Sequence, residues 1–473
     1  MKKIYAIIAI AALVCACNSK ENTTPEGEAQ GIPFVATVQT SNDAYTRAVA
    51  ESGGDIVVNF NQGEIIALVY EVNSTAYKTN ATVASVDGSG KATVTATLQA
   101  GVTDGTPVTL IYPGAAADGT TGNVLAATLS TQDGTLGTGR DIRKGTGTIK
   151  VDGTASLAAG ATLDAEYAIC KFEVKDVDGS NSLSVSRFVV KDASNNVITT
   201  VTPGSATSTL YVALPTSSEL LWFEAVASDK PYVAKGTAAL TAGNFYTPTV
   251  KMATIMNVIG ADGKFYKNKD AAVAASTSAS AIIASLGEET AEDGYPHGLA
   301  IAMGISTGMT KKWKAEGTAS HTQYASYDLA LAAKESGSAL CVGKNDADNY
   351  PAFYAALNNS ITAAEGITSS KPSSGTSNWF LPSVYQINLI IKGLLGTTAN
   401  LTNMDQTALL ATGVYYPIQA AGYVSTAPWN SNGNKVWTST EKSDGEAWTY
   451  VSSGKLQGIN KTYVAYVIAT LAF

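Results

Sequence analysis

Few residues in this chain are of the types that catalyse reactions or bind metals. It has two histidines and four cysteines in 473 residues, too few for a zinc cluster or a disulfide scaffold. The segment Gly304-Ile-Ser-Thr-Gly308 has the letters of a hydrolase nucleophile elbow. That chemistry needs a strand–turn–helix context with an acid and a histidine in order, whereas His321 follows Ser306 by only fifteen residues. We therefore expect no enzyme, and no catalytic residue, metal site or cofactor.

The first seventeen residues contain a cysteine that could carry lipid. Two lysines precede an apolar stretch, residues 4–14, that is typical of a signal peptide and too short to span a bilayer. Ala16 before Cys17 resembles a bacterial lipobox, so we expect cleavage before Cys17, lipid on its thiol, and a polar tether over residues 18–30. Cys15 is a second candidate with a poorer preceding residue. The alternative is an ordinary secretory cleavage beside a chance cysteine.

The two remaining cysteines fit the interior of the protein better than a disulfide. Cys170 shares the even positions of an alternating segment with Ala168, Phe172 and Val174, which places them on one face of a strand. Cys341 lies in a similarly apolar context. A disulfide between them would bridge two predicted domains, so we expect two small core residues.

Composition and charge exclude two classes of protein. Hydrophobic residues make up 45% and charged residues 15% of the chain, which argues against a disordered protein. The net charge of −8 and pI of about 5.0 argue against a nucleic-acid binder. At about 100–200 residues per domain, the length predicts three domains.

The sequence between residues 31 and 252 predicts short strands separated by turns. Such a pattern indicates β-sandwiches, and the stretch is long for a single one, so we divide it near residue 165. The predicted strands span residues 34–39, 65–70, 91–98, 108–112, 184–191, 209–214 and 220–226.

The sequence pattern changes after Met252, where predicted helices alternate with predicted strands. Five of the six tryptophans also lie in this region. The strongest helix is predicted over residues 382–395, with Pro382 in its first turn and Ile387, Ile391 and Leu394 on its apolar face. We predict a separate α+β domain here. Further helices are predicted at 269–286, 327–334 and 350–357, and strands at 435–438, 447–451 and 463–473.

Five segments before residue 252 follow one another in a distinctive order: Phe60 to Tyr70, Leu110 to Pro113, Gln132 to Leu136 with Asp141-Ile142, Tyr167 to Val174, and Leu240 to Thr247. Their order and spacing resemble the fimbrillin family, the type V pilins of Bacteroidetes. This resemblance implies tandem β-sandwiches and assembly into a pilus with neighbouring subunits.

The segment Tyr45-Thr46-Arg47-Ala48 is similar to the processing site of that family. The resemblance implies cleavage between Arg47 and Ala48 by an arginine-specific protease. Cleavage would remove the strand predicted at 34–39, open a hydrophobic groove that a strand from the next subunit could fill, and discard lipidated Cys17. An ordinary exposed arginine in a loop is the alternative.

The last third contains a second series of motifs: His297 to Met303, Trp313, Tyr350 to Phe353, Asn378 to Ser383, Trp437 to Glu441, Ala447-Trp448, and Tyr463 to Phe473. These resemble C-type-lectin-like C-terminal domains on surface proteins of the same bacteria. The family often carries arginines in its last strand, whereas Ala465 and Ala469 lie there in this chain. Trp379, Trp437 and Trp448 are expected to be core aromatics.

We therefore predict a mainly β protein, with two tandem fimbrillin-type β-sandwiches followed by an α+β C-type-lectin-like domain. The predicted boundaries are a signal peptide at 1–17, a tether at 18–30, sandwiches at 31–165 and 166–256, and the α+β domain at 257–473. If the last strand belongs to a domain core it cannot be donated, and the chain fits the tip of a pilus.

The ligand of such a tip would be a host or microbial glycan or protein, and we expect no nucleic acid. The polar, aromatic loop 425–434 and Glu441 are the predicted binding surface. Two alternatives stay open: a non-polymerising outer-membrane lipoprotein that binds glycan, and a structural subunit without a ligand. All three place the protein at the cell surface, with lipid on Cys17 as its contact with the outer membrane. The predicted ligand residues are Trp429, Asn430, Asn432, Asn434 and Glu441.

Overall fold

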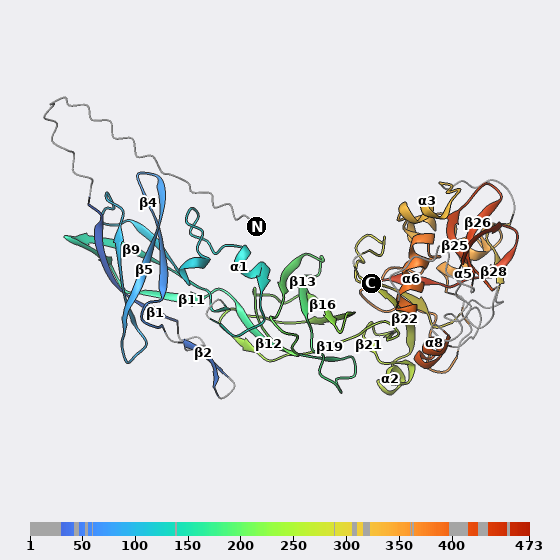
Figure 1. Ribbon diagram of the computed structural model, residues 1–473, viewed down its shortest axis with the longest axis horizontal. Helices are drawn as coiled ribbons and strands as arrows, with labels where there is room; N and C mark the ends of the chain where they lie inside the picture. The colour runs from blue at the N-terminus through green and yellow to red at the C-terminus, as the bar shows by residue number, and fades with distance from the viewer. Residues whose placement is uncertain are drawn as a thin grey trace, which may run out of the picture.

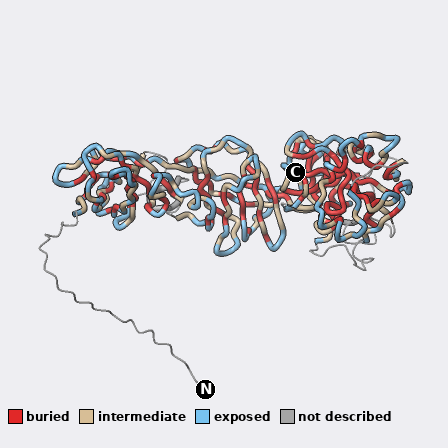
Figure 2. The backbone as a smooth tube through the Cα atoms, turned by 90° about the horizontal axis from the view of Figure 1, so that it is seen from above, coloured by how far each residue is buried: buried red, intermediate tan, exposed pale blue. Residues whose placement is uncertain are grey.

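The computed structural model shows a mainly β protein whose three lobes follow one another along its long axis (Figure 1). Buried residues gather inside each lobe (Figure 2). The boundaries at residues 165 and 256 stay a prediction. The structure describes residues 30–41, 47–52, 55–58, 60–137, 140–287, 289–304, 310–315, 322–359, 361, 364–396, 415–423, 434–451 and 455–473.

The first lobe is a sandwich whose ladder of strands closes on itself. Strand β1 pairs with β6 on one side and with β10 and β11 on the other, so the sheet has no break at this point. A short 3-10 helix, η1 (Gly114–Ala116), follows β7. The strands are β1 (Ile32–Thr40), β4 (Ile65–Val72), β5 (Thr75–Val86), β6 (Ala92–Leu98), β7 (Pro107–Tyr112), β9 (Arg143–Asp152), β10 (Thr154–Leu157) and β11 (Ala161–Ala165).

Two further strands, β2 (Arg47–Ser52) and β3 (Asp55–Val58), form a hairpin of their own. This hairpin projects from the first lobe (Figure 1). A two-stranded hairpin without a third strand is marginally stable in water.

The second lobe packs two sheets against each other. Phe172, Phe188 and Phe223 fill the space between the sheets, with ring centroids 5.4–5.7 Å apart. Cys170 is buried on β12 beside Phe172, which confirms its predicted place in the core, and it is a free thiol. One sheet comprises β12 (Ala168–Asp176), β15 (Thr209–Leu214), β18 (Phe245–Tyr246) and β19 (Thr249–Met252).

The other sheet of this lobe includes a strand that comes from well before residue 165. Helix α1 (Ala127–Ser130) leads into β8 (Thr131–Gln132), which pairs with β14. The Gln132 side chain donates to Thr199 Oγ1 at 3.1 Å and to the Ala213 carbonyl at 2.9 Å. This crossing segment ties the first lobe to the second. The strands are β17 (Lys230–Thr237), β16 (Leu220–Ala227), β13 (Arg187–Lys191), β14 (Val197–Val201) and β8.

The C-terminal lobe has two sheets of five strands with short helices around them. The first sheet has the order β21 (Phe265–Tyr266), β20 (Val258–Gly260), β22 (Ala279–Leu286), β23 (Gly298–Ala302) and β29 (Thr470–Ala472). The second has the order β24 (Thr310–Lys312), β28 (Val464–Tyr466), β25 (Lys435–Glu441), β26 (Glu446–Val451) and β27 (Lys455–Asn460). The helices are α2 (Lys269–Ala274), α3 (Tyr327–Ala332), α4 (Gly337–Leu340), α5 (Pro351–Leu357), α6 (Val384–Leu395) and α8 (Tyr415–Ala421).

Helix α6 begins and ends at residues that are typical helix caps. Ser383 caps it, and Gln386 completes a reciprocal capping box, while Gly396 ends it in the left-handed region at φ 65°. Pro382 lies just before the cap and outside the first turn, which corrects its predicted position. Ile387, Ile391 and their apolar neighbours are buried, which confirms the predicted face.

The helix predicted over 269–286 is wrong in its second half. Helix α2 ends at Ala274, and Ala279–Leu286 forms the central strand β22. Ser276 has φ 61°, a conformation that does not continue a helix. Six consecutive residues of β22, Ala279–Ala284, are buried, so the strand shows no alternation that would distinguish it from a buried helix.

Candidate functional site

Strand β1 is held by hydrogen-bonded ladders on both of its edges. It runs antiparallel to β6 over seven residue pairs, from Ile32–Leu98 to Val38–Ala92. Its other edge runs parallel to β10 and β11, through Phe34–Ala155 and through three pairs that start at Val38–Ala161. Removing β1 would therefore leave unpaired backbone groups on two separate edges of the first lobe.

The same strand also contributes to the hydrophobic core. Phe34 and Val38 are 1% and 0% exposed, and Ala36 between them is buried as well. Burying a Phe or Val side chain contributes about 1.5–3 kcal/mol. A Cβ on Gly31, at the start of the strand, would lie 2.6 Å from a Thr97 methyl carbon, so β1 begins in close contact with β6. The space occupied by β1 is thus an apolar slot shaped for one strand.

The predicted scissile bond lies in the hairpin that follows β1. Arg47 is the first residue of β2 and pairs with Val58, and the next pair is Ala50–Val57. The register shift between these two pairs leaves Ala48 outside the regular ladder. The bond between Arg47 and Ala48 therefore lies at an irregularity of an isolated hairpin, seven residues after the end of β1.

The last strand of the sequence, β29, is also bonded on both edges. On one side it pairs with β23. On the other side Thr470 exchanges backbone hydrogen bonds of 2.8 and 2.9 Å with Phe380, and the Ala472 N–H donates to Ser377 Oγ at 2.9 Å. Phe473 is 1% exposed. This strand is therefore a core element of the C-terminal lobe, as the sequence predicts. The single strand predicted at 463–473 is wrong in extent, because the segment divides into β28 and β29, which lie in different sheets.

A buried charged cluster joins the second lobe to the C-terminal lobe beside β29. The His297 N–H donates to the Phe473 carbonyl at 2.8 Å, and its ring stacks on Trp222 with centroids 3.8 Å apart. His297 Nδ1 lies 2.9 Å from Glu224 Oε1, to which Lys191 Nζ also donates at 2.9 Å. The second lobe thus contacts the residue that holds the end of β29.

The surroundings of Glu224 stabilise its charged form. Burial by itself raises the pKa of a carboxyl group, but hydrogen bonds from His297 and Lys191, together with their charges, lower the pKa of Glu224 below its ordinary value. Nearby, burial lowers the pKa of Lys235 to about 8, where its ammonium lies over the rings of Trp222 and Phe265. These contacts make the junction a packed polar interface.

Three of the predicted ligand residues, Trp429, Asn430 and Asn432, lie outside the described residues. Cys17 lies outside them as well. Asn434 is described and half-buried, directly before β25. Glu441 is fully buried at the end of that strand, and its Oε1 lies 3.2 Å from Lys461 Nζ. The prediction that Glu441 belongs to an exposed binding surface is therefore wrong, because the carboxylate pairs with a buried lysine.

The predicted core aromatics are in place. Trp379, Trp437 and Trp448 are at most 6% exposed. Each indole N–H donates to a backbone carbonyl, at 3.1, 2.7 and 2.9 Å respectively. These tryptophans hold the fold together and leave little surface for a ligand.

The strands that flank β1 on its parallel side are not among those predicted from the sequence. Ala155 on β10 and Leu163 on β11 pair with β1 and are buried. The alternating segments Thr154–Leu157 and Ala161–Ala165 were the available signal. Ser306 lies outside the described residues.

Membrane-spanning helices and metal-binding clusters can be assessed only in the described part of the chain. Its helices include none long and apolar enough to cross a membrane. Within the same residues, no three His, Cys, Asp or Glu side chains gather in a way that could hold a metal ion. Cys341 is a free, buried thiol, and burial raises its pKa to about 12.

Neither a protein-family model nor a curated protein matches the sequence. Among solved structures, the chain is similar to a fimbrial protein of Bacteroides ovatus at 13% identity and a TM-score of 0.32, over 94% of this chain and 99% of that one. A candidate cell adhesion protein of the same species has 14% identity and a TM-score of 0.28, over 48% and 95%. The minor pilin of Streptococcus agalactiae has 7% identity and a TM-score of 0.22, over 47% and 96%. These TM-scores are low, so we base the function on contacts within this chain.

Proposed function

We propose that this chain is a pilus tip subunit and adhesin that is exported as a lipoprotein on Cys17. In this proposal a protease cuts after Arg47, β1 leaves its slot, and a strand from the neighbouring subunit takes its place. The observation that carries the proposal is the double pairing of β1, with β6 on one edge and β10 and β11 on the other. A single cut in the following hairpin separates this whole strand from the rest of the chain, so that only the two ladders and the buried side chains hold it.

The pairing of β29 supports a position at the end of the polymer. Its backbone is bonded to β23 and to the segment around Phe380, and its side chains are buried. Donating this strand would require unfolding the C-terminal lobe. A subunit that receives a strand in the slot of β1, and keeps β29, fits the pilus tip.

The order of the lobes supports an exposed adhesive domain. The slot of β1 lies in the first lobe and the C-terminal lobe is at the opposite end of the molecule (Figure 1). A subunit attached through the first lobe would therefore present the C-terminal lobe outward. A surface on that lobe is the natural place for a ligand.

The proposal is tested by the variant Arg47→Ala, with Arg187→Ala, an exposed arginine on β13, as the matched control. We expect Arg47→Ala to stay in the outer-membrane fraction with lipid on Cys17 and to disappear from sheared pili. The Arg187→Ala chain should be found in the pili like the wild type. Incorporation of Arg47→Ala into pili would overturn the proposal, as would immunogold labelling of residues 257–473 along the whole shaft.

A second function is favoured by one specific feature. The uncut chain is already a closed fold, because β1 fills its own slot. A lipoprotein that stays uncut on the outer membrane and displays the C-terminal lobe would therefore be stable without partners. Recovery of intact residues 18–47 in the mature surface protein would favour this function.

A further inference from the structure

The second sheet of the C-terminal lobe carries two lysines on one face, at one of its ends. Lys435 on β25 pairs with Val451 on β26, which in turn pairs with Lys455 on β27, so these side chains share a face. Neighbouring strands are about 4.8 Å apart, so Lys435 and Lys455 lie about 10 Å from each other. Lys312 on β24 pairs with Val464, which belongs to the opposite face. We call Lys435 and Lys455 the lysine row.

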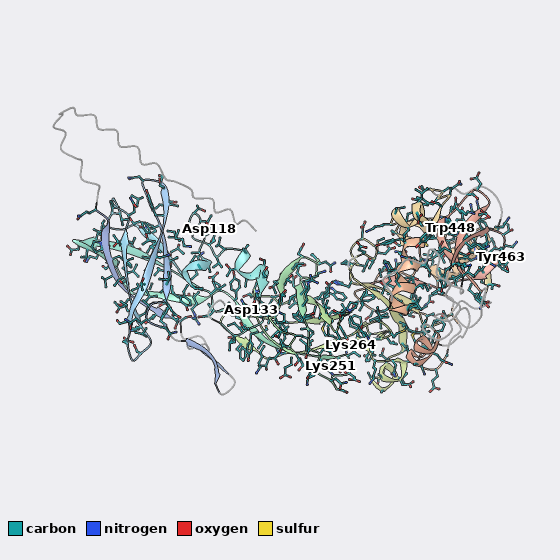
Figure 3. All side chains as sticks on the ribbon, in the orientation of Figure 1. Asp118, Asp133, Lys251, Lys264, Trp448 and Tyr463 are labelled. Atoms are coloured by element: carbon teal, nitrogen blue, oxygen red, sulfur yellow. The ribbon has the colours of Figure 1, made fainter. Side chains whose placement is uncertain are left out.

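An exposed aromatic residue lies beside this row. Tyr463 precedes β28 and is 51% exposed, and Val464 next to it is 48% exposed. Lys435 Nζ lies 5.2 Å from the centroid of the Tyr463 ring. Figure 3 places Tyr463 at the end of the molecule that is farthest from the first lobe. A flat ring next to ammonium groups thus faces outward at this end.

The row is basic although the whole chain is acidic. Residues 310–315 and 434–473 contain seven lysines and three acidic residues, whereas the chain has 31 basic and 39 acidic residues. Two of those acids are already paired, Glu441 with Lys461 and Glu446 with Lys442. Glu441 and Glu446 lie at the other end of β25 and β26, away from the lysine row. The positive charge of the row is therefore not neutralised by these carboxylates.

The shape of this surface narrows the class of ligand. A stable protein partner buries about 800 Å² on each side around apolar anchors, and the large exposed apolar side chains here are Tyr463 and Val464. A nucleic acid would meet the field of a protein with net charge −8. Sugars bind shallow aromatic surfaces by stacking their C–H faces, and widely spaced lysines suit separated anionic groups. The features fit an extended, acidic sugar chain best.

We infer that the lysine row and Tyr463 bind a linear acidic polysaccharide that carries a carboxylate or sulfate on alternate sugars. One sugar stacks on Tyr463, and successive anionic groups pair with Lys435 and Lys455. This inference rests on the proposed function, in which the C-terminal lobe is the free end of the pilus. It replaces buried Glu441 with these two lysines as the groups that select the ligand.

The test measures binding of the purified full-length surface chain to immobilised chondroitin sulfate, unsulfated chondroitin and neutral dextran. We expect binding to one or both acidic polymers that weakens as salt rises, and none to dextran. Tyr463→Ala, and the double change Lys435→Gln and Lys455→Gln, should each weaken binding by about tenfold or more. Lys251→Gln, an exposed lysine on β19 in the second lobe, is the matched control and should bind like the wild type.

Each outcome of this test decides the inference. Binding to chondroitin sulfate alone assigns the recognised group as sulfate, and equal binding to unsulfated chondroitin assigns it as carboxylate. The inference is overturned by equal binding to dextran, by no binding to either acidic polymer, or by an equal loss in Lys251→Gln. The Arg47→Ala chain keeps the lysine row, so it should bind the acidic polymer even if it never enters a pilus. Failure of the inference and failure of the proposed function can therefore be told apart.

Discussion

Glu224 is the centre of the charged contact between the second lobe and the C-terminal lobe. Its side chain is 16% exposed, whereas those of Lys191 and His297 are 3% and 1% exposed. A lysine this deeply buried depends on its carboxylate partner, because an unpaired charge in the interior is strongly destabilising. The contact therefore fixes the orientation of the C-terminal lobe as well as holding β29.

Glu224→Gln keeps the shape of the side chain and removes its charge. We expect it to lower the free energy of unfolding by about 3 kcal/mol, since Lys191 loses its counter-charge. The measurement is urea denaturation followed by tryptophan fluorescence, because Trp222 lies in the same contact. The exposed Glu219→Gln, at the start of the same strand region, should change stability by less than about 0.5 kcal/mol. An equal effect of both variants would contradict a special role for Glu224.

The lowered pKa of Glu224 also predicts a pH dependence. A carboxyl group whose pKa is lower in the folded than in the unfolded state stabilises the fold at neutral pH. This contribution declines as the pH falls below about 4.3, the ordinary value for glutamate, and is lost below the lowered pKa of the folded state. Unfolding curves measured from pH 7 to 3 should therefore fall less steeply for Glu224→Gln than for the wild type. Parallel curves would show that Glu224 is not the titrating group.

At the scale of elements, β1 combines a buried face with an exposed one. Phe34→Ala in the uncut chain should lower the free energy of unfolding by about 3–5 kcal/mol, because Phe34 fills the core of the first lobe. Val35→Ala on the opposite face is the control, since Val35 is 50% exposed, and should change it little. Denaturant unfolding of the two variants measures this difference. Similar values would mean that β1 does not fill an apolar slot.

Strand β29 should be among the most protected elements of the protein. The amides of Thr470, Ala472 and Phe473 each donate to a partner at 2.9–3.0 Å. Hydrogen exchange should be slow at these amides both before and after cleavage at Arg47, and fast in the exposed turn at residues 87–90. Rapid exchange of β29 in the cleaved chain would indicate that this strand can be released and donated.

The sequence predicted those elements whose pattern is local. Strands such as β1 and β6 alternate buried and exposed residues between clear turns, and helix α6 carries its own cap signals. Strand β22 was missed because it is buried on both faces, so its residues follow no strand period. The pairing of β1 with β10 and β11 joins residues more than 100 positions apart, and no local pattern encodes it.

The candidate site was predictable to a similar degree. The Arg47–Ala48 motif and the buried face of β1 are visible in the sequence, and the structure shows how they relate. Glu441 was read as exposed because charged residues usually are, but Lys461, twenty residues later, pairs with it inside the lobe. The lysine row depends on the register of β25, β26 and β27 and is visible only once these strands are paired.

At the scale of the whole molecule, the proposed site of assembly and the proposed site of ligand binding lie at opposite ends. The slot of β1 is in the first lobe, and the lysine row with Tyr463 is at the far end of the C-terminal lobe (Figures 1 and 3). The second lobe lies between them, tied to the first by β8 and to the third by the Glu224 cluster. Such an arrangement suits a subunit that attaches at one end and binds at the other.

The proposed function depends most on cleavage between Arg47 and Ala48, which would empty the slot of β1. The most direct measurement is the first residue of the protein recovered from the native cell surface, determined by mass spectrometry of its N-terminal peptide. We expect a chain that starts at Ala48 and lacks residues 18–47. A lipid-modified start at Cys17 in the assembled protein would contradict this cleavage.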